Sequence, residues 1–60
     1  MYTDKENLTV LETAIYLSID IKKVVTRIKE GRMKSFVQND VIYIPIEEVR
    51  SFQMYLNSSF

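Results

Sequence analysis

The chain contains neither cysteine nor histidine, and this absence restricts how its 60 residues can fold. Disulfides and cysteine- or histidine-bound zinc are the usual supports of very small domains. A domain of this length buries only about 60% of the surface that its unfolded chain exposes. We therefore expect one small domain that rests on its hydrophobic core, with any further support coming from a partner.

The composition predicts a folded protein, because 47% of the residues are apolar and 27% are charged. Disordered chains combine low hydrophobicity with high net charge. The first residues show no basic segment followed by an apolar stretch, and no apolar run approaches the roughly 18 residues that cross a bilayer. We expect a cytoplasmic protein with no membrane association.

The charges are segregated along the chain, although their formal sum is zero. Residues 21–37 carry a formal charge of +5, from Glu30 and six cations: Lys22, Lys23, Arg27, Lys29, Arg32 and Lys34. The other residues carry −5. A positive segment on an acidic protein is typical of a nucleic-acid-binding face. The simpler alternative, a solvated helix face with salt-bridge partners, is disfavoured by the single acidic residue in the segment.

A first helix is predicted to begin after Thr9. Thr9 and Glu12 have the spacing of a capping box, in which each side chain accepts from the other residue's backbone N–H. Leu8 precedes the cap as a hydrophobic staple. The helix extends to Leu17 because apolar residues recur at helical spacing; they are Val10, Ala14 and Leu17.

A second helix is predicted from Ile21 to about Glu30. Asp20 is a favourable N-cap, and Gly31 lies where a left-handed residue ends a helix. The apolar residues Ile21, Val24 and Ile28 recur at spacings of three and four. They predict one buried stripe.

A hairpin and a third helix are predicted after Gly31. Residues 35–37 and 41–44 are rich in β-branched and aromatic side chains, and Asn39 and Asp40 between them tolerate positive φ. Pro45 ends the second strand and can begin a helix, whose apolar stripe is Val49, Phe52 and Leu56. The predicted fold class is α+β, in the order helix, helix, hairpin, helix. Residues 8–56 form the domain, between an N-terminal arm at 1–7 and a tail at 57–60.

Two short helices with a basic second helix describe a helix-turn-helix, and the following hairpin describes a wing. The chain resembles the excisionase and MerR-like winged helix-turn-helix family from Leu8 to about Leu56. Three groups of residues carry the resemblance: Leu8-Thr9-Val10 with Glu12, Ala14 and Leu17; Val24 with Ile28 to Met33; and Tyr43-Ile44-Pro45 with Glu47, Glu48, Val49 and Phe52.

The resemblance implies that the second helix enters the DNA major groove while the wing lies on the backbone or in the minor groove. Carried over by position, the outward residues of this recognition helix are Lys22, Lys23, Thr26 and Arg27. Arg27 would pair with a guanine edge, and Thr26 would touch a thymine methyl group. Phosphate contacts are expected from Lys22 and Lys23, and from Lys29, Arg32 and Lys34.

The wing departs from the family pattern. Gln38 and Asn39 at its tip are the expected wing contacts, but the arginines common there are absent and Asp40 adds a carboxylate. Strong insertion of the wing into the minor groove is therefore not expected. Ser18 also replaces the glycine often found in the turn between the two helices.

Leu11 and Ile15 occupy positions that are usually charged in the family. They lie one turn apart on the first helix, beside its core stripe. They form either a wider core stripe under the third helix or a surface for protein contact, through self-association along DNA or through docking to a larger partner.

The predicted function is sequence-specific binding of double-stranded DNA in a bacterial host cell, as an excisionase or small transcriptional regulator of a phage or mobile element. An integrase, recombinase or host protein is a possible partner, and cooperative self-association on DNA is expected. The alternative is a protein-interaction module, such as a phage inhibitor or adaptor, that does not bind DNA.

Enzymatic activity is not expected. Histidine and cysteine are absent, and the neighbouring Glu47 and Glu48 would point about 100° apart on a helix, so they could not act as an acid–base pair. A single glycine excludes a glycine-rich phosphate loop. No cofactor, metal or small-molecule substrate is expected.

Overall fold

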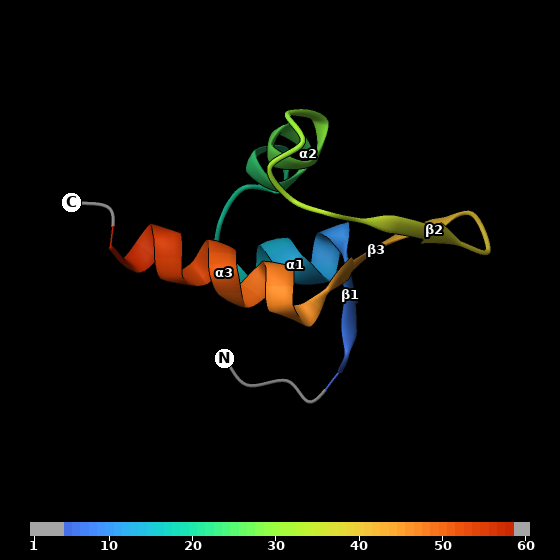
Figure 1. Cartoon of the computed structure of the whole chain (residues 1–60), viewed down its shortest axis with the longest axis horizontal. Coiled ribbons are helices and arrows are strands. Elements are labelled where there is room, and N and C mark those ends of the chain that lie inside the picture. Colours follow the sequence, from blue (N-terminus) through green and yellow to red (C-terminus); the bar gives the residue numbers. More distant parts are fainter. Residues whose placement is uncertain (1–4, 59–60) are drawn as a thin grey trace.

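The computed structural model describes residues 5–58, which form three helices and a three-stranded antiparallel sheet (Figure 1). The elements are β1 (Asn7–Thr9), α1 (Val10–Leu17), α2 (Ile21–Lys29), β2 (Phe36–Gln38), β3 (Val41–Pro45) and α3 (Ile46–Asn57). The predicted α+β class is confirmed. The observed order has an additional strand, β1, before the first helix.

The sheet has the order β1-β3-β2, so β3 is its central strand. Leu8 of β1 pairs with Ile44, and the Ile46 backbone N–H donates to the Glu6 carbonyl at 2.8 Å. The sequence prediction placed Asn7 in an N-terminal arm, whereas in the structure Asn7 begins β1. Residues 1–4 of that predicted arm lie outside the described residues.

The capping box at the start of α1 is confirmed. The Thr9 backbone N–H donates to Glu12 Oε1 at 2.9 Å, and the Glu12 N–H donates to Thr9 Oγ1 at 3.1 Å. The Lys5 ammonium also pairs with Glu12. This ammonium, with the Thr9 N–H second, holds the pKa of Glu12 below its ordinary value. The lowered pKa means that the Glu12 side chain accepts the Thr9 N–H as a carboxylate, which strengthens this hydrogen bond.

The first two helices end in the same backbone arrangement. Ser18 has φ +56° and Gly31 has φ +74°, which are left-handed values. The Ser18 and Gly31 N–H groups each donate to a carbonyl three residues earlier, and the N–H groups after them, of Ile19 and Arg32, each donate to a carbonyl five residues earlier. Both ends are therefore Schellman motifs. Gly31 confirms the predicted helix stop, whereas Ser18 holds a conformation that glycine adopts more readily.

The predicted hairpin is formed by β2 and β3, and it projects away from the three helices (Figure 1). Asn39 and Asp40 at its tip have φ of +53° and +63°, as a type I′ turn requires. Phe36 and Tyr43 are paired across the strands, with stacked rings whose centroids lie 5.8 Å apart. Pro45 ends β3, and α3 begins at the next residue, as predicted.

The core gathers side chains from all parts of the fold. Its buried apolar residues are Leu8, Ala14, Val24, Met33, Ile44, Ile46, Val49 and Phe52. Val10, Leu17, Ile28 and Leu56, also predicted as core, are partly buried against this cluster. The prediction of a buried Ile21 is wrong, since this side chain is 40% exposed. It lies in the first turn of α2, in which the helix's buried residue is Val24, three residues further on.

The C-terminal end of the described chain continues α3 rather than beginning a tail. Asn57, predicted as the first tail residue, is the last residue of α3, and the Ser58 N–H donates to the Met54 carbonyl at 3.0 Å. Residues 59–60 lie outside the described residues. No helix within residues 5–58 has the length and apolar character needed to cross a membrane.

The left-handed conformation of Ser18 leads to a stability prediction. Ser18→Gly removes the steric cost of a side chain at positive φ, which exceeds the added unfolded-state entropy. We expect about 0.5–1 kcal/mol of stabilisation and a rise in Tm of several degrees, measured by thermal and urea unfolding.

Gly31→Ala is the matched control. An added Cβ at Gly31 meets no atom within 4 Å, so only the backbone conformation is penalised. We expect Gly31→Ala to lower the free energy of unfolding by about 1 kcal/mol. A Ser18→Gly variant that is less stable than the unsubstituted chain would contradict this interpretation of the turn.

Candidate nucleic-acid interface

The outward face of α2 is cationic. Val24 is fully buried, and at about 100° per residue Lys22, Thr26 and Lys29 fall on the opposite side of the helix. All three side chains are exposed, as is Lys23 at the edge of this face. Lys22, Lys23 and Lys29 lie on this face or at its edge, and α2 contains no acidic residue, so the face carries a concentrated positive charge.

The cations of this face have no ion-pair partner among residues 5–58. The carboxylates nearest in sequence have other roles: Asp20 accepts from the Lys22 backbone N–H at 2.8 Å and thereby caps α2, and Glu30 Oε1 lies 3.7 Å from Arg32 Nε. The ammonium groups of Lys22, Lys23 and Lys29 are therefore available to an external anion.

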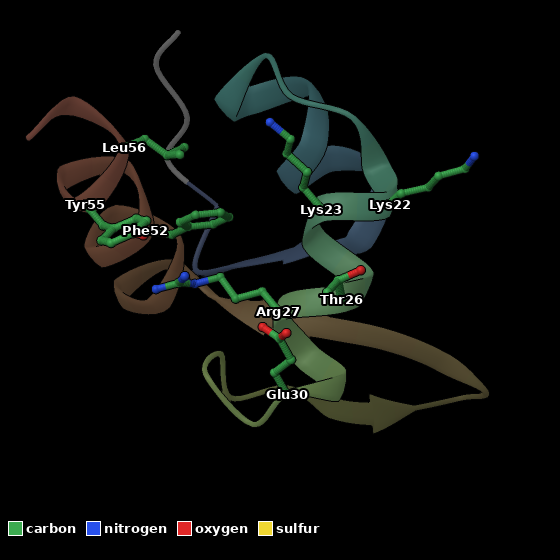
Figure 2. Close-up of a pocket in the computed structure, with 8 residues that line it drawn as sticks. All are labelled: Lys22, Lys23, Thr26, Arg27, Glu30, Phe52, Tyr55 and Leu56. Atoms are coloured by element: carbon green, nitrogen blue, oxygen red, sulfur yellow. The ribbon is translucent and has the colours of Figure 1, made fainter. Parts of the chain in front are cut away.

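Arg27 does not point outward, so that part of the sequence prediction is wrong. Its guanidinium carbon lies 4.2 Å from the centroid of the Phe52 ring and 4.9 Å from that of Tyr55 (Figure 2). Arg27 follows Val24 by three residues, so it lies only about 60° from the buried side of α2. At this angle its long side chain reaches α3 and lies over the two rings, an attractive cation–π arrangement.

The Arg27 guanidinium is partly desolvated in this position. Its Nε is buried and has no hydrogen-bond partner among the described residues. An orphaned N–H of this kind costs about 1–3 kcal/mol, which is as large as the cation–π attraction it accompanies. The contact therefore fixes the orientation of Arg27 more than it adds to the stability of the fold.

A groove of about 370 Å³ separates α2 from α3 (Figure 2). The α2 side of the groove is lined by cations, which are Lys22, Lys23 and Arg27. The α3 side is lined by apolar side chains, which are Phe52, Tyr55 and Leu56. In Figure 2, Lys22 points away from α3, whereas Arg27 reaches across to the rings. The predicted site residues of α2 thus separate into an outward face and a groove wall.

The remaining predicted contacts lie outside α2. Arg32 and Lys34 are exposed after the helix, and the Lys34 backbone N–H donates to Glu48 Oε1 at 2.9 Å. This hydrogen bond ties the segment after α2 to the start of α3 and leaves the Lys34 ammonium in solvent. Gln38 and Asn39 are exposed at the end of the hairpin, on a different element from the α2 cations.

Leu11 and Ile15 are 58% and 54% exposed. The interpretation of these residues as a wider core stripe is therefore wrong. The buried side of α1 is formed by Thr13 and Ala14, and the Thr13 hydroxyl donates to the Thr9 carbonyl at 2.8 Å. Leu11 and Ile15 lie one turn apart and present two large apolar side chains to solvent.

Sequence reasoning missed the role of Phe52 and Tyr55 as the surface that holds Arg27. Their spacing of three residues places both rings on one side of α3, and this signal was present in the sequence. The sequence did not show that α2 would lie with Arg27 above them, because this depends on the packing of α2 against α1.

Compared with protein-family models, with curated proteins and with solved structures, the chain matches none. Within the described part of the chain, no three acidic side chains gather into a site that could hold a metal ion.

The contact of Arg27 with Tyr55 leads to a prediction of energetic coupling. A double-mutant cycle with Arg27→Ala and Tyr55→Ala should give a coupling free energy of about 0.5–1 kcal/mol, measured by urea unfolding. Met54 is the control, since it neighbours Tyr55 and is 72% exposed. The Arg27–Met54 cycle should lie within about 0.3 kcal/mol of zero, and equal coupling in both cycles would exclude a specific contact.

Proposed function

We propose that this chain binds double-stranded DNA as a small winged helix-turn-helix protein, with α2 as the recognition helix and the β2–β3 hairpin as the wing. The observation that carries the proposal is the outward face of α2, where Lys22 and Lys29 are exposed and have no ion-pair partner among residues 5–58. A short exposed helix with unpaired cations on one side fits a major groove about 12 Å wide.

The orientation of Arg27 changes the expected division of roles. Lys22, Lys23 and Lys29 supply phosphate contacts, which provide affinity without sequence information. Thr26, between them on the outward face, is the α2 residue best placed to contact a base edge. Since Arg27 is held on α3, one short helix supplies little base discrimination. High specificity then requires tandem or cooperative occupation of repeated sites.

In this proposal the hairpin contributes to DNA binding through its shape and through uncharged hydrogen-bond donors. Gln38 and Asn39 offer amide groups that can donate to phosphate oxygens. Asp40 places a carboxylate at the tip, which disfavours insertion between phosphates. Arg32 and Lys34 lie in the chain between α2 and the hairpin, so they extend the positive face toward it.

The resemblance to excisionases favours a role in directing recombination, or a role as a small transcriptional regulator, for a phage or mobile element. Such a protein acts beside an integrase or recombinase in the cytoplasm of a bacterial host. No catalytic step is part of the proposal. The DNA substrate is bent or organised by the bound protein.

The phosphate contacts predict a salt-dependent affinity that depends on α2. Lys22→Ala and Lys29→Ala should each weaken binding to all duplex sequences and lower the salt slope, d log K/d log[salt], by about one. The measurement is fluorescence anisotropy of labelled duplexes over a range of salt concentrations. Thr26→Ala should mainly reduce the preference among sequences.

Arg50→Ala is the control for charge alone, because Arg50 is an exposed cation on α3. The Arg50→Ala substitution should leave the affinity for duplex DNA nearly unchanged. Binding that does not depend on salt, or an Arg50→Ala variant as weak as Lys22→Ala, would contradict the proposed face.

A second candidate function, a protein-interaction module such as a phage inhibitor or adaptor, is favoured by the exposure of Leu11 and Ile15. Contiguous apolar surface on a monomer can mark a contact site, and Leu11 and Ile15 lie one turn apart on the same side of α1. The same surface also serves the DNA-binding proposal, as the contact between molecules bound at adjacent sites.

The two uses of Leu11 and Ile15 are separated by one variant. Leu11→Glu combined with Ile15→Lys should remain folded, since both side chains are more than half exposed. If copies associate along DNA, the variant should bind single sites normally and lose the cooperative step on repeated sites in gel shifts. Met54→Lys is the control, because Met54 is a large apolar residue on α3 that is 72% exposed.

An unchanged cooperative step in the Leu11/Ile15 variant would exclude self-association through this surface. A chain that elutes freely from heparin at low salt, but whose complex with a host protein is lost in the variant, would support the interaction module instead.

A further inference from the structure

We propose that the groove between α2 and α3 binds an acidic peptide segment of a partner protein, with a peptide carboxylate on the cations of α2 and an apolar peptide side chain against α3. This ligand is additional to the DNA of the preceding section, and the inference does not depend on DNA binding. It rests on the composition of the groove walls, the state of Arg27 and the exposure of the α3 side chains.

The positive charge of the groove favours an anionic ligand. Three cations of α2 line it, Lys22, Lys23 and Arg27, and Glu30 is its single acidic lining residue. The Lys22 ammonium points away from α3 (Figure 2), but the Lys23 ammonium beside the groove has no ion-pair partner among residues 5–58. A carboxylate placed there gains charge-assisted hydrogen bonds that the protein itself does not satisfy.

The Arg27 guanidinium is preorganised to bind such a carboxylate. Stacking on Phe52 and Tyr55 restricts the guanidinium, so less conformational entropy is lost when it binds. Its Nε is buried and so is not open to a ligand. The structure gives the guanidinium no ion pair among residues 5–58. A planar, restricted guanidinium is the group that recognises carboxylates in bidentate geometry.

The apolar wall selects a peptide over a nucleic acid. Tyr55 is 51% exposed and Leu56 is partly buried, so apolar surface borders the cations directly. Duplex DNA presents phosphates and stacked bases, and its projecting apolar groups are single thymine methyls in the major groove, which offer less contact to this wall than a leucine side chain. A single-stranded base could stack on an open ring, but the Arg27 guanidinium already lies over both rings. A leucine-like side chain beside a carboxylate satisfies both walls.

The groove and the proposed DNA-binding face share Lys22 and Lys23. A bound acidic peptide would neutralise Lys23 and occupy the side of α2 next to α3. Peptide and DNA should therefore compete, and a partner protein with such a segment would release the chain from DNA.

The test measures binding of three labelled peptides to the full chain by fluorescence anisotropy. In the first peptide glutamates flank a pair of leucines; in the second glutamine replaces glutamate; in the third serine replaces leucine. We expect the first to bind, and the other two to bind at least about tenfold more weakly, because each lacks one of the two interactions.

Matched variants locate the peptide in the groove. Tyr55→Ala and Lys23→Ala should weaken the first peptide by about fivefold or more, whereas Met54→Ala and Lys29→Ala should change its affinity by less than about twofold. Met54 and Lys29 are exposed neighbours on the same helices, outside the groove lining. Circular dichroism confirms that each variant is folded.

Three results would overturn the inference. These are equal affinity for the glutamate and glutamine peptides, no peptide binding at all, or an oligothymidine strand that binds more tightly than the peptide and depends on Tyr55. None of these results bears on duplex DNA, whose binding is measured separately. Failure of the peptide and failure of the DNA proposal can therefore be distinguished.

Discussion

The orientation of α2 is the constraint on which the functional surface depends, and two side chains on one side of the helix set it. Val24 is fully buried in the core, and Arg27, about 60° around the helix, lies over Phe52 and Tyr55 of α3. The core contact supplies the hydrophobic stabilisation. The arginine contact adds little net free energy, because the buried Nε offsets the attraction to the rings, and it keeps the Arg27 guanidinium on the α3 side of α2.

Once α2 is held in this way, its remaining cations separate into two groups. Lys22 and Lys29, with Thr26 between them, face away from the protein, while Lys23 lies at the edge of the groove beside α3. The outward group suits the regular spacing of phosphates along a duplex. The groove combines charge with apolar surface, which suits an amphipathic segment. One short helix therefore carries two chemically different surfaces.

Local signals in the sequence predicted the ends of the elements well. The capping box at Thr9, the N-cap at Asp20, the left-handed Gly31 and the Asn39-Asp40 turn all depend on a few neighbouring residues, so a single sequence contains the relevant information. Strand β1 was missed because three residues are too few to show alternation. Its existence depends on pairing with β3, which lies far along the chain.

The candidate site could be predicted only in part, for the same reason. The segregation of charge located the positive helix, but the direction of each cation depends on tertiary packing. Arg27 was assigned to the outward face because helical periodicity places it off the apolar stripe, yet its side chain is long enough to reach α3. Ile21 was assigned to the core because it shares the apolar stripe of Val24 and Ile28, yet its side chain is 40% exposed in the first turn of α2. Met33, between two cations, gave no pattern and is buried.

The account is tested most directly by a nuclear magnetic resonance titration of the isotope-labelled chain with a mixed-sequence duplex at low salt. Arg27 Hε lies near two aromatic rings, so its resonance carries a ring-current shift that reports the contact with α3. We predict that the Lys22, Thr26 and Lys29 amides move on addition of DNA while the Arg27 Hε shift is retained. Loss of that shift on binding, or movement confined to residues outside α2 and the hairpin, would contradict the account.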